Sequence, residues 1–250
     1  MLQKENMRKL FLACLMLPLL GPAEEPSLME LADKIFSTRT PETGADEALA
    51  LYEKELQTQP TSAEAQWKAA RACYWLADHG KSKKEKIKKF EQGIAFAEKA
   101  VALDPKSTDA HFWLSGLYGS YGELKGVLKS LALLKPIRTE LHTINRLDDH
   151  YQGGAGYRIL GIVDYKVPGF AGGSKKRARE LLNKALAIDP NNPFNRYYMA
   201  EFLATAAGDK KTAREHLLIL KDLAVNEDVD APDLDQIKKK GEKLMTQIGM

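Results

Sequence analysis

Apolar residues recur along most of this chain at intervals of three and four, the spacing of amphipathic α-helices. Between residues 178 and 190, for example, the apolar positions fall on a single helical face. Residues 61–64 and 82–85 match the capping box that begins a helix. No stretch alternates apolar and polar residues as a half-buried β-strand would. The pattern therefore predicts an all-α protein with about ten to twelve helices of ordinary length.

Three segments repeat one arrangement, in which an amphipathic helix ends at a proline and a helix with aromatic residues follows. Pro60, Pro105 and Pro190 close the first helix of each segment. A small residue lies twelve positions before each proline and an aromatic residue lies seven positions after it: Ala48, Gly93 and Ala178, then Trp67, Phe112 and Tyr197. This arrangement is typical of tetratricopeptide repeats, in which small residues let two helices touch. The sequence therefore predicts a tetratricopeptide-like helical repeat array, an α-solenoid.

The N-terminus has a different composition from the repeats. Two basic residues, Arg8 and Lys9, precede an apolar run over residues 10–20, and small residues around Ala23 precede Glu24. This order is that of a secretory signal peptide, and the run is shorter than the roughly 20 apolar residues of a membrane-spanning helix. A buried N-terminal helix is the alternative, but the run is apolar on every side. We therefore expect residues 1–23 to be removed and the protein to be periplasmic, with residues 24–250 forming one helical-repeat domain.

Cysteine content and charge narrow the class of protein further. Cys14 lies inside the predicted signal peptide, after too short an apolar run for a lipid-attachment site, so we do not expect a lipoprotein. Cys73 is then the single cysteine of the mature chain, which excludes an intramolecular disulfide. Without the three basic residues and one acidic residue of the signal peptide, the formal net charge of +3 falls to +1. A nearly neutral chain is not expected to bind nucleic acid.

A diverged unit is predicted at about residues 120–173, because the prolines at 105 and 190 are 85 residues apart and one repeat needs only about 34. Within it we expect one helix near residues 122–133. A second helix should start at Pro136 and run to about Tyr151, and a third should cover about residues 155–165.

The third of these helices is preceded by a glycine-rich stretch with the sequence GGAGYRILGIVDYKVPGF. No strand precedes it and no Lys-Ser/Thr pair follows it, so a phosphate-binding loop is not expected. We interpret the stretch as a structural hinge instead. Gly153 and Gly154 would form a tight turn with positive φ, Gly161 would allow close helix contact, and Pro168-Gly169 would end the helix.

The segment 151–204 resembles the T component of tripartite ATP-independent periplasmic (TRAP) transporters. The shared features are Gly153-Gly154, Arg158, Leu160-Gly161, Lys166-x-Pro168-Gly169 and the closing repeat from Ala178 to Pro190. The resemblance implies an all-helical periplasmic protein with a pore or concave groove. It further implies pairing with an extracytoplasmic solute-binding protein and transfer of a small, partly apolar ligand.

Arg158 is the leading candidate for ligand contact, because its planar guanidinium suits a carboxylate or another anion. We favour the other interpretation, a structural ion pair with one of three nearby acids, Asp148, Asp149 or Asp164, because semi-buried arginines usually pair within the fold. Further candidates for ligand or partner contact are Tyr157, Lys166 and the repeat aromatics Trp67, Phe112 and Tyr197. Aromatic residues at helical spacing commonly fill gaps between helices, so a core role is their alternative.

Catalytic and metal-binding patterns are not found in the sequence. The five histidines are scattered, without the spacing of metal ligands, so we expect neither a metal nor a cofactor. The triplet Asp148-Asp149-His150 has no accompanying nucleophile, so we do not expect an enzyme. We predict an exported binding protein that partners a TRAP-type solute-binding protein, with a cavity for a small apolar or carboxylate ligand. The alternative is a general periplasmic scaffold for protein–protein contact without a small ligand, and a homo-oligomer is a candidate state for either.

Overall fold

The computed structural model describes residues 26–226 and 229–249, and the predicted signal peptide lies outside them. Eleven α-helices, one 3₁₀ turn and one π-helical turn make up these residues: α1 (Leu28–Ser37), α2 (Ala45–Thr58), α3 (Ala63–Asp78), α4 (Lys83–Leu103), α5 (Thr108–Lys125), α6 (Val127–Leu147), α7 (Tyr151–Lys166), η1 (Gly169–Ala171), α8 (Lys175–Ile188), α9 (Pro193–Phe202), η2 (Leu203–Ala207), α10 (Lys210–Asp222) and α11 (Ala231–Gln247). The described residues contain no strand beyond an isolated bridge between Asn226 and Val229. None of the described helices is long and apolar enough to cross a membrane.

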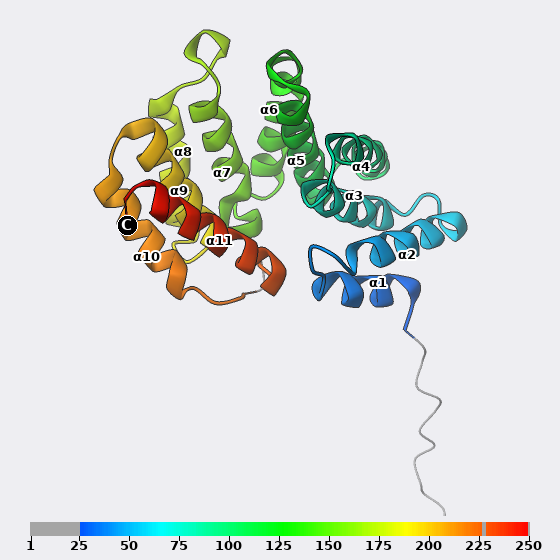
Figure 1. Ribbon diagram of the computed structural model, residues 1–250. Coiled ribbons are helices and arrows are strands. Elements are labelled where there is room, and N and C mark those ends of the chain that lie inside the picture. The colour runs from blue at the N-terminus through cyan, green and yellow to red at the C-terminus, as the bar shows by residue number, and fades with distance from the viewer. Residues whose placement is uncertain (1–25, 227–228, 250) are drawn as a thin grey trace, which may run out of the picture.

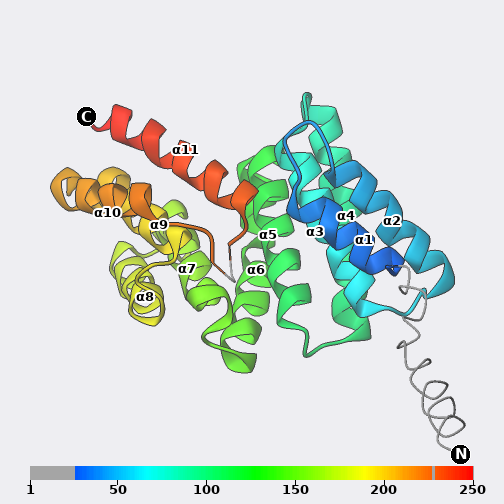
Figure 2. The same ribbon diagram turned by 90° about the horizontal axis from the view of Figure 1, so that it is seen from below.

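Successive helices pack against one another and curve into an arc (Figure 1). The helices that follow the three repeat prolines, α3, α5 and α9, form an inner row together with α7, and in this row α3 contacts α5 and α7 contacts α9. Helices α2, α4, α6 and α8 pack behind this row. The connection after α10 leads back toward the N-terminal helices, and α11 then runs across the concave side away from α1, as Figure 2 shows from below. The predicted all-α solenoid is thus confirmed, and its last helix lies inside the arc.

Small residues set the distance between helices in the repeats. Ala48, Gly93 and Ala178 are all buried. A Cβ atom at Gly93 would come within 2.8 Å of Leu117 Cδ2 and 2.9 Å of Cys73 Cβ, so a larger residue would push α3, α4 and α5 apart. Burial also raises the pKa of the Cys73 thiol to about 12, and this thiol therefore behaves as an apolar packing group.

The helices of the diverged unit differ from the prediction. Helix α5 continues to Lys125 and α6 begins at Val127, with the break at Gly126, whose φ is 103°. The expected helix over 122–133 is therefore wrong. Pro136 lies inside α6 instead of starting a helix. Proline removes one backbone hydrogen bond there, but the buried side chains of Ile137, Leu141 and Ile144 pack the helix against α7.

The helix caps agree with the sequence in one case and differ in another. Ser82 and Glu85 form the predicted capping box of α4. The box predicted at 61–64 is wrong, because Ser62, one residue later, caps α3 by accepting a hydrogen bond from the Ala65 N–H at 3.1 Å. A further capping box, formed by Ser27 and Glu30, begins α1.

A buried ion pair joins α5 to α6. His111 Nδ1 bonds to the Glu140 carboxylate, and His111 Nε2 lies 3.0 Å from the Pro105 carbonyl oxygen. The Glu140 carboxylate raises the pKa of His111 above its usual value, although burial opposes the shift. A raised folded-state pKa means that the pair stabilises the fold below the unfolded-state pKa of 6.5, and that this stability is lost as the pH rises through the raised pKa.

Replacing this histidine should therefore have a pH-dependent effect. We expect His111→Gln to lower the free energy of unfolding at about pH 6 more than at about pH 8, as measured by urea denaturation. His142→Gln, at an exposed position of α6, is the matched control. A loss of stability in His111→Gln that is equal at both pH values would contradict the assignment.

Candidate functional site

The concave side of the arc, which we call the inner face, is the surface that the fold offers for binding. It is formed by α3, α5, α7 and α9, and α11 already lies on it (Figures 1 and 2). The apolar face of α11 packs into the core of α9 and α10 through Leu234, Ile237 and Leu244. A Cβ atom at Gly241 would come within 2.8 Å of Leu220 Cδ2, so α11 lies unusually close to α10.

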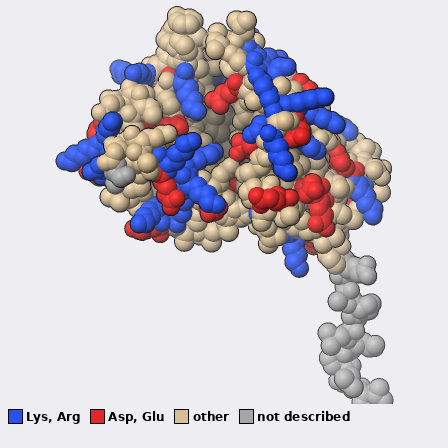
Figure 3. All heavy atoms as spheres, in the orientation of Figure 1, with Lys and Arg blue, Asp and Glu red and all other residues tan. Residues whose placement is uncertain are grey.

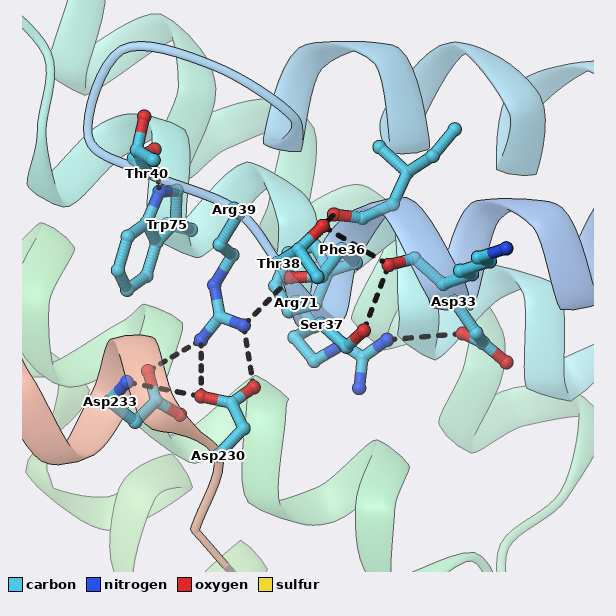
Figure 4. Close-up of polar contacts among 12 residues, drawn as sticks. Asp33, Phe36, Ser37, Thr38, Arg39, Thr40, Arg71, Trp75, Asp230 and Asp233 are labelled. Carbon is cyan, nitrogen blue, oxygen red and sulfur yellow. Dashed lines mark hydrogen bonds and ion pairs between the residues drawn. The ribbon is translucent and has the colours of Figure 1, made fainter. Parts of the chain in front are cut away.

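The start of α11 is also fastened to the N-terminal helices, by a group of three residues that we call the clasp: Arg39, Asp230 and Asp233. Arg39 Nη1 donates to Asp230 Oδ2 at 2.6 Å, and Arg39 Nη2 donates to Asp233 Oδ1 at 2.5 Å (Figure 4). Asp230 is also the N-cap of α11 and accepts a hydrogen bond from the Asp233 N–H at 3.0 Å. The same acids therefore start the helix and anchor it.

Because the Arg39 side chain is buried, its charge has to be balanced by the two carboxylates of the clasp. The Arg39 side chain is only 2% exposed, and its guanidinium carbon lies 4.0 Å from the centre of the Phe36 ring and 4.2 Å from that of Trp75. Arg39 Nη1 also donates to the Phe36 carbonyl oxygen at 3.0 Å. Burial raises the pKa of the Asp233 carboxyl, and the positive charge of Arg39 opposes that shift. An arginine between two rings in this setting needs its acidic partners, because an unpaired buried charge is costly.

A second polar group lies beside the clasp and orders the first two helices. Arg71 stacks on the Phe36 ring at 4.2 Å and donates to the Tyr52 hydroxyl at 3.1 Å and to Asp33 Oδ1 at 3.3 Å. Lys68 Nζ donates to Asp33 Oδ2 at 2.5 Å. Asp33 therefore binds two basic residues of α3 and fixes the helix that leads into Arg39.

A further contact continues along α11. Gln236 Nε2 donates to Asp78 Oδ2 at 2.6 Å, which links α11 to the end of α3. Nearby on the inner row, Tyr74 packs edge-on against Phe90 and Trp113, and burial raises its pKa to about 12. Helix α11 is thus held by apolar packing along its length and by additional polar contacts at its start.

Arg158, the leading candidate from the sequence, has a structural position. It is 4% exposed, and its Nη1 donates to Asn195 Oδ1 at 2.9 Å and to the Gln152 carbonyl oxygen at 3.3 Å. The carboxylate of Asp164, one of its three expected partners, pairs instead with Arg138 and Arg177. Arg158 therefore connects the start of α7 to α9.

The glycine turn lies directly beside this contact. Gln152, Gly153 and Gly154 have φ values of 44°, 64° and 82°, which bend the chain at the start of α7. Asn195 Nδ2 donates to the Gly153 carbonyl oxygen at 2.9 Å. A Cβ atom at Gly153 would lie 2.7 Å from Asn192 Nδ2, so this position has room only for glycine.

The other candidates are dispersed rather than gathered into one site. Lys184 Nζ donates to the Tyr157 hydroxyl at 2.7 Å, between α7 and α8. Lys166 is exposed and pairs with Glu123 at 3.6 Å. The ring of Phe112 packs against those of Trp113 and Tyr151. The ring of Tyr197 packs against that of Tyr198. The ring of Trp67 lies beside the basic groups of Lys68 and Arg71. Gly161 packs against Leu182, and Pro168 and Gly169 lie between α7 and η1.

Three surface features of the described residues could accept small ligands or ions. One is a recess of about 330 Å³ lined by Tyr165, Lys166, Lys175, Glu201, Thr205 and Ala206. A second recess of about 410 Å³ is lined by Arg138, His142, Leu160, Gly172, Arg177 and Leu181, and neither Tyr157 nor Arg158 borders it. The side chains of Asp148, Asp149 and His150 lie together at the end of α6, on the surface. Both arginines of the second recess already pair with Asp164, so their charge is largely satisfied.

Sequence reasoning missed the clasp, because its members are 191 residues apart in the chain. Only the acidic side of it left a local signal: Asp230 and Asp233 flank Ala-Pro at the start of α11, a usual helix-starting pattern. Nothing near Arg39 indicates a long-range partner. A contact between residues so far apart in the chain can be identified only from the three-dimensional structure of the arc.

The fold and the occupied inner face define a tetratricopeptide-like helical array. Residues 28–155 match the family model described as Regulator of microtubule dynamics protein 1-3, and since this is just over half of the chain, the chain belongs to that family. No curated protein sequence matches the chain.

Solved structures support the same fold. A tetratricopeptide protein from Thermus thermophilus, TTC0263, matches with a TM-score of 0.64 and 18% identity, over 88% of this chain and 97% of that chain. MamA matches with a TM-score of 0.50 and 19% identity, over 86% of this chain and 98% of that chain. At these identities the likeness concerns the fold alone.

Breaking the clasp should destabilise the protein. We expect Asp233→Asn to lower the free energy of unfolding by about 1–2 kcal/mol, because the variant leaves part of the buried Arg39 charge uncompensated. The carboxylate is 31% exposed, which keeps the effect below that of a fully buried pair. Asp235→Asn removes an acid of α11 that pairs with Lys239 on the surface, and it should leave the urea midpoint unchanged. Equal midpoints for both variants would contradict this role of the clasp.

Proposed function

We propose that this protein is a non-catalytic interaction scaffold whose inner face binds a helical segment with an acidic N-terminal end. The main support for this proposal is the position of α11, which lies on that face. A concave helical array that holds an amphipathic helix in this way uses the helix-in-groove mode of recognition. The protein's own helix therefore indicates the chemistry that a partner segment would need.

The required chemistry can be read from the contacts. The clasp places a buried arginine where the first turn of the bound helix presents two carboxylates. The core of α9 and α10 accepts apolar residues three and four positions apart, here Leu234, Ile237 and Gly241. A partner helix with acids at its start and a narrow apolar stripe would satisfy both ends.

The family's description as a regulator of microtubule dynamics agrees with a protein as the partner, and we propose that class of partner here. We also propose that the protein acts after export, because residues 7–23 have the order of a signal peptide. The purified secreted chain should then begin at Glu24.

A narrower version, in which the partner is a TRAP-type solute-binding protein and the inner face holds a small ligand, follows from the sequence resemblance. The contacts of the candidate ligand-binding residues support this version less well than they support a scaffold without a small ligand. Arg158 and Tyr157 bond to Asn195 and Lys184, and neither borders the recess beside Arg138. The scaffold without a small ligand is therefore the function that we propose.

The scaffold can be tested with α11 supplied as a separate peptide. A labelled peptide of residues 229–249 should bind full-length protein carrying Asp230→Asn and Asp233→Asn at least about tenfold more tightly than it binds the parent. The double variant weakens the resident helix but leaves Arg39 available to the peptide. Fluorescence anisotropy measures the difference.

Two controls make the test specific. A peptide that carries the same two substitutions should bind the double variant no more tightly than the parent protein. Full-length Asp235→Asn should bind the natural peptide with the same affinity as the parent protein does. Equal affinity of the natural peptide for every receptor would reject the inner face as a helix-binding surface.

A further inference from the structure

Three large apolar side chains project into solvent at two neighbouring turns of the array. Val127 and Leu128, at the start of α6, are 73% and 86% exposed, and Phe170, in η1, is 90% exposed. These are the three most exposed large apolar residues among those that the structure describes. Isolated exposed apolar residues are common, but such a cluster at one edge marks an interaction surface.

The two turns are held next to each other by polar contacts at their bases. Lys166 Nζ lies 3.6 Å from Glu123 Oε1, which links the end of α7 to the end of α5. Arg177 Nη2 donates to the Gly172 carbonyl oxygen at 2.6 Å, and Arg138 Nη2 lies 3.4 Å from the same oxygen. Both turns point away from the inner face, at the top of Figure 1. We call this surface, with its apolar residues Val127, Leu128 and Phe170, the edge tip.

Positive charge surrounds the edge tip. Residues 123–135 and 165–177 together contain seven lysines and arginines and one acid, Glu123, although the whole chain is nearly neutral. Lys125 and Lys129 lie on either side of the exposed apolar pair in the sequence, with their Nζ atoms 5.7 and 5.5 Å from the centre of the Tyr121 ring. The basic groups therefore form a rim behind the apolar ends.

We propose that the edge tip docks on the surface of a membrane that contains anionic lipids. Apolar side chains on a basic rim have the arrangement of proteins that insert shallowly at the lipid interface. The lysines would contact lipid phosphates while Leu128 and Phe170 enter the boundary between headgroups and acyl chains.

The shape of the edge tip favours a lipid surface over an acidic protein. The apolar residues are 73–90% exposed at two turns, and the two protrusions at the top of Figure 3 carry no charged atoms at their ends. A protein partner would need a pair of matching pockets, whereas a fluid interface accepts protruding side chains without a preformed shape. The edge tip is also separate from the inner face, so membrane contact would leave α11 and its clasp in place.

The test is the depth to which position 170 enters a bilayer. We would make Phe170→Trp in the full-length chain and measure quenching of its fluorescence by phosphatidylglycerol with brominated acyl chains, mixed into phosphatidylcholine vesicles. The parent chain supplies the background, because it has three tryptophans of its own. Leu218→Trp, at a position that is 48% exposed on α10, is the matched control.

We expect the added tryptophan at 170 to be quenched with the anionic vesicles but not when all lipids are phosphatidylcholine, and the tryptophan at 218 to stay unquenched with both. Both variants carry the same residues 1–23, so any vesicle binding by those residues is common to the two. Equal quenching at both positions, or none at 170, would overturn the proposal.

Two further variants test the chemistry of the rim and the tip. Replacing Lys125, Lys129 and Lys176 with glutamine should weaken binding to anionic vesicles by at least about tenfold, because each lysine near such a surface contributes several-fold. Leu128→Ser should reduce quenching at position 170 without changing the far-ultraviolet circular dichroism. Binding of a polyglutamate peptide at the edge tip, with no vesicle binding, would instead identify an acidic polypeptide as the partner and reject the membrane.

Discussion

The salt bridge from Arg39 to Asp230 and Asp233 is the contact on which the closed form of this protein depends. In a helical repeat array each helix contacts mainly its neighbours, so the two ends of the arc have no inherent connection. The clasp joins residues 191 positions apart and brings the start of α11 to the first helices. Because Arg39 lies between two aromatic rings, its guanidinium is buried, while the carboxylates of Asp230 and Asp233 stay about a third exposed.

Occupation of the inner face follows from this closure. The apolar face of α11, from Leu234 to Leu244, belongs to the core of α9 and α10, and the clasp connects the start of the helix to the first helices of the arc. A partner helix of similar chemistry would compete with a segment that is always present at high effective concentration. The same arrangement leaves the edge tip free, so that two surfaces of the protein, one concave and one at the edge, can act independently.

Much of the fold was predictable because it rests on local patterns. The repeat prolines and the small residues at 48, 93 and 178 indicated paired helices, and these pairs are present. The helix boundaries near Gly126 and Pro136 differ from the prediction, because the apolar face of α6 continues the helix past the proline. Among the contacts of Arg158 are a side-chain amide and a backbone carbonyl, and short-range charge patterns do not reveal such contacts. The clasp could not be found at all, since one arginine in a loop carries no sign of acids at the far end of the chain.

Amide hydrogen exchange on Arg39→Gln compared with the parent protein tests the central claim most directly. If the clasp holds α11 across the inner face, amides in its first turns, residues 234–238, should exchange faster in the variant. Those in residues 241–247 should keep their protection, because Leu244 remains in the core of α9 and α10. Unchanged protection in the first turns would show that α11 stays in place without the clasp, and would contradict the account.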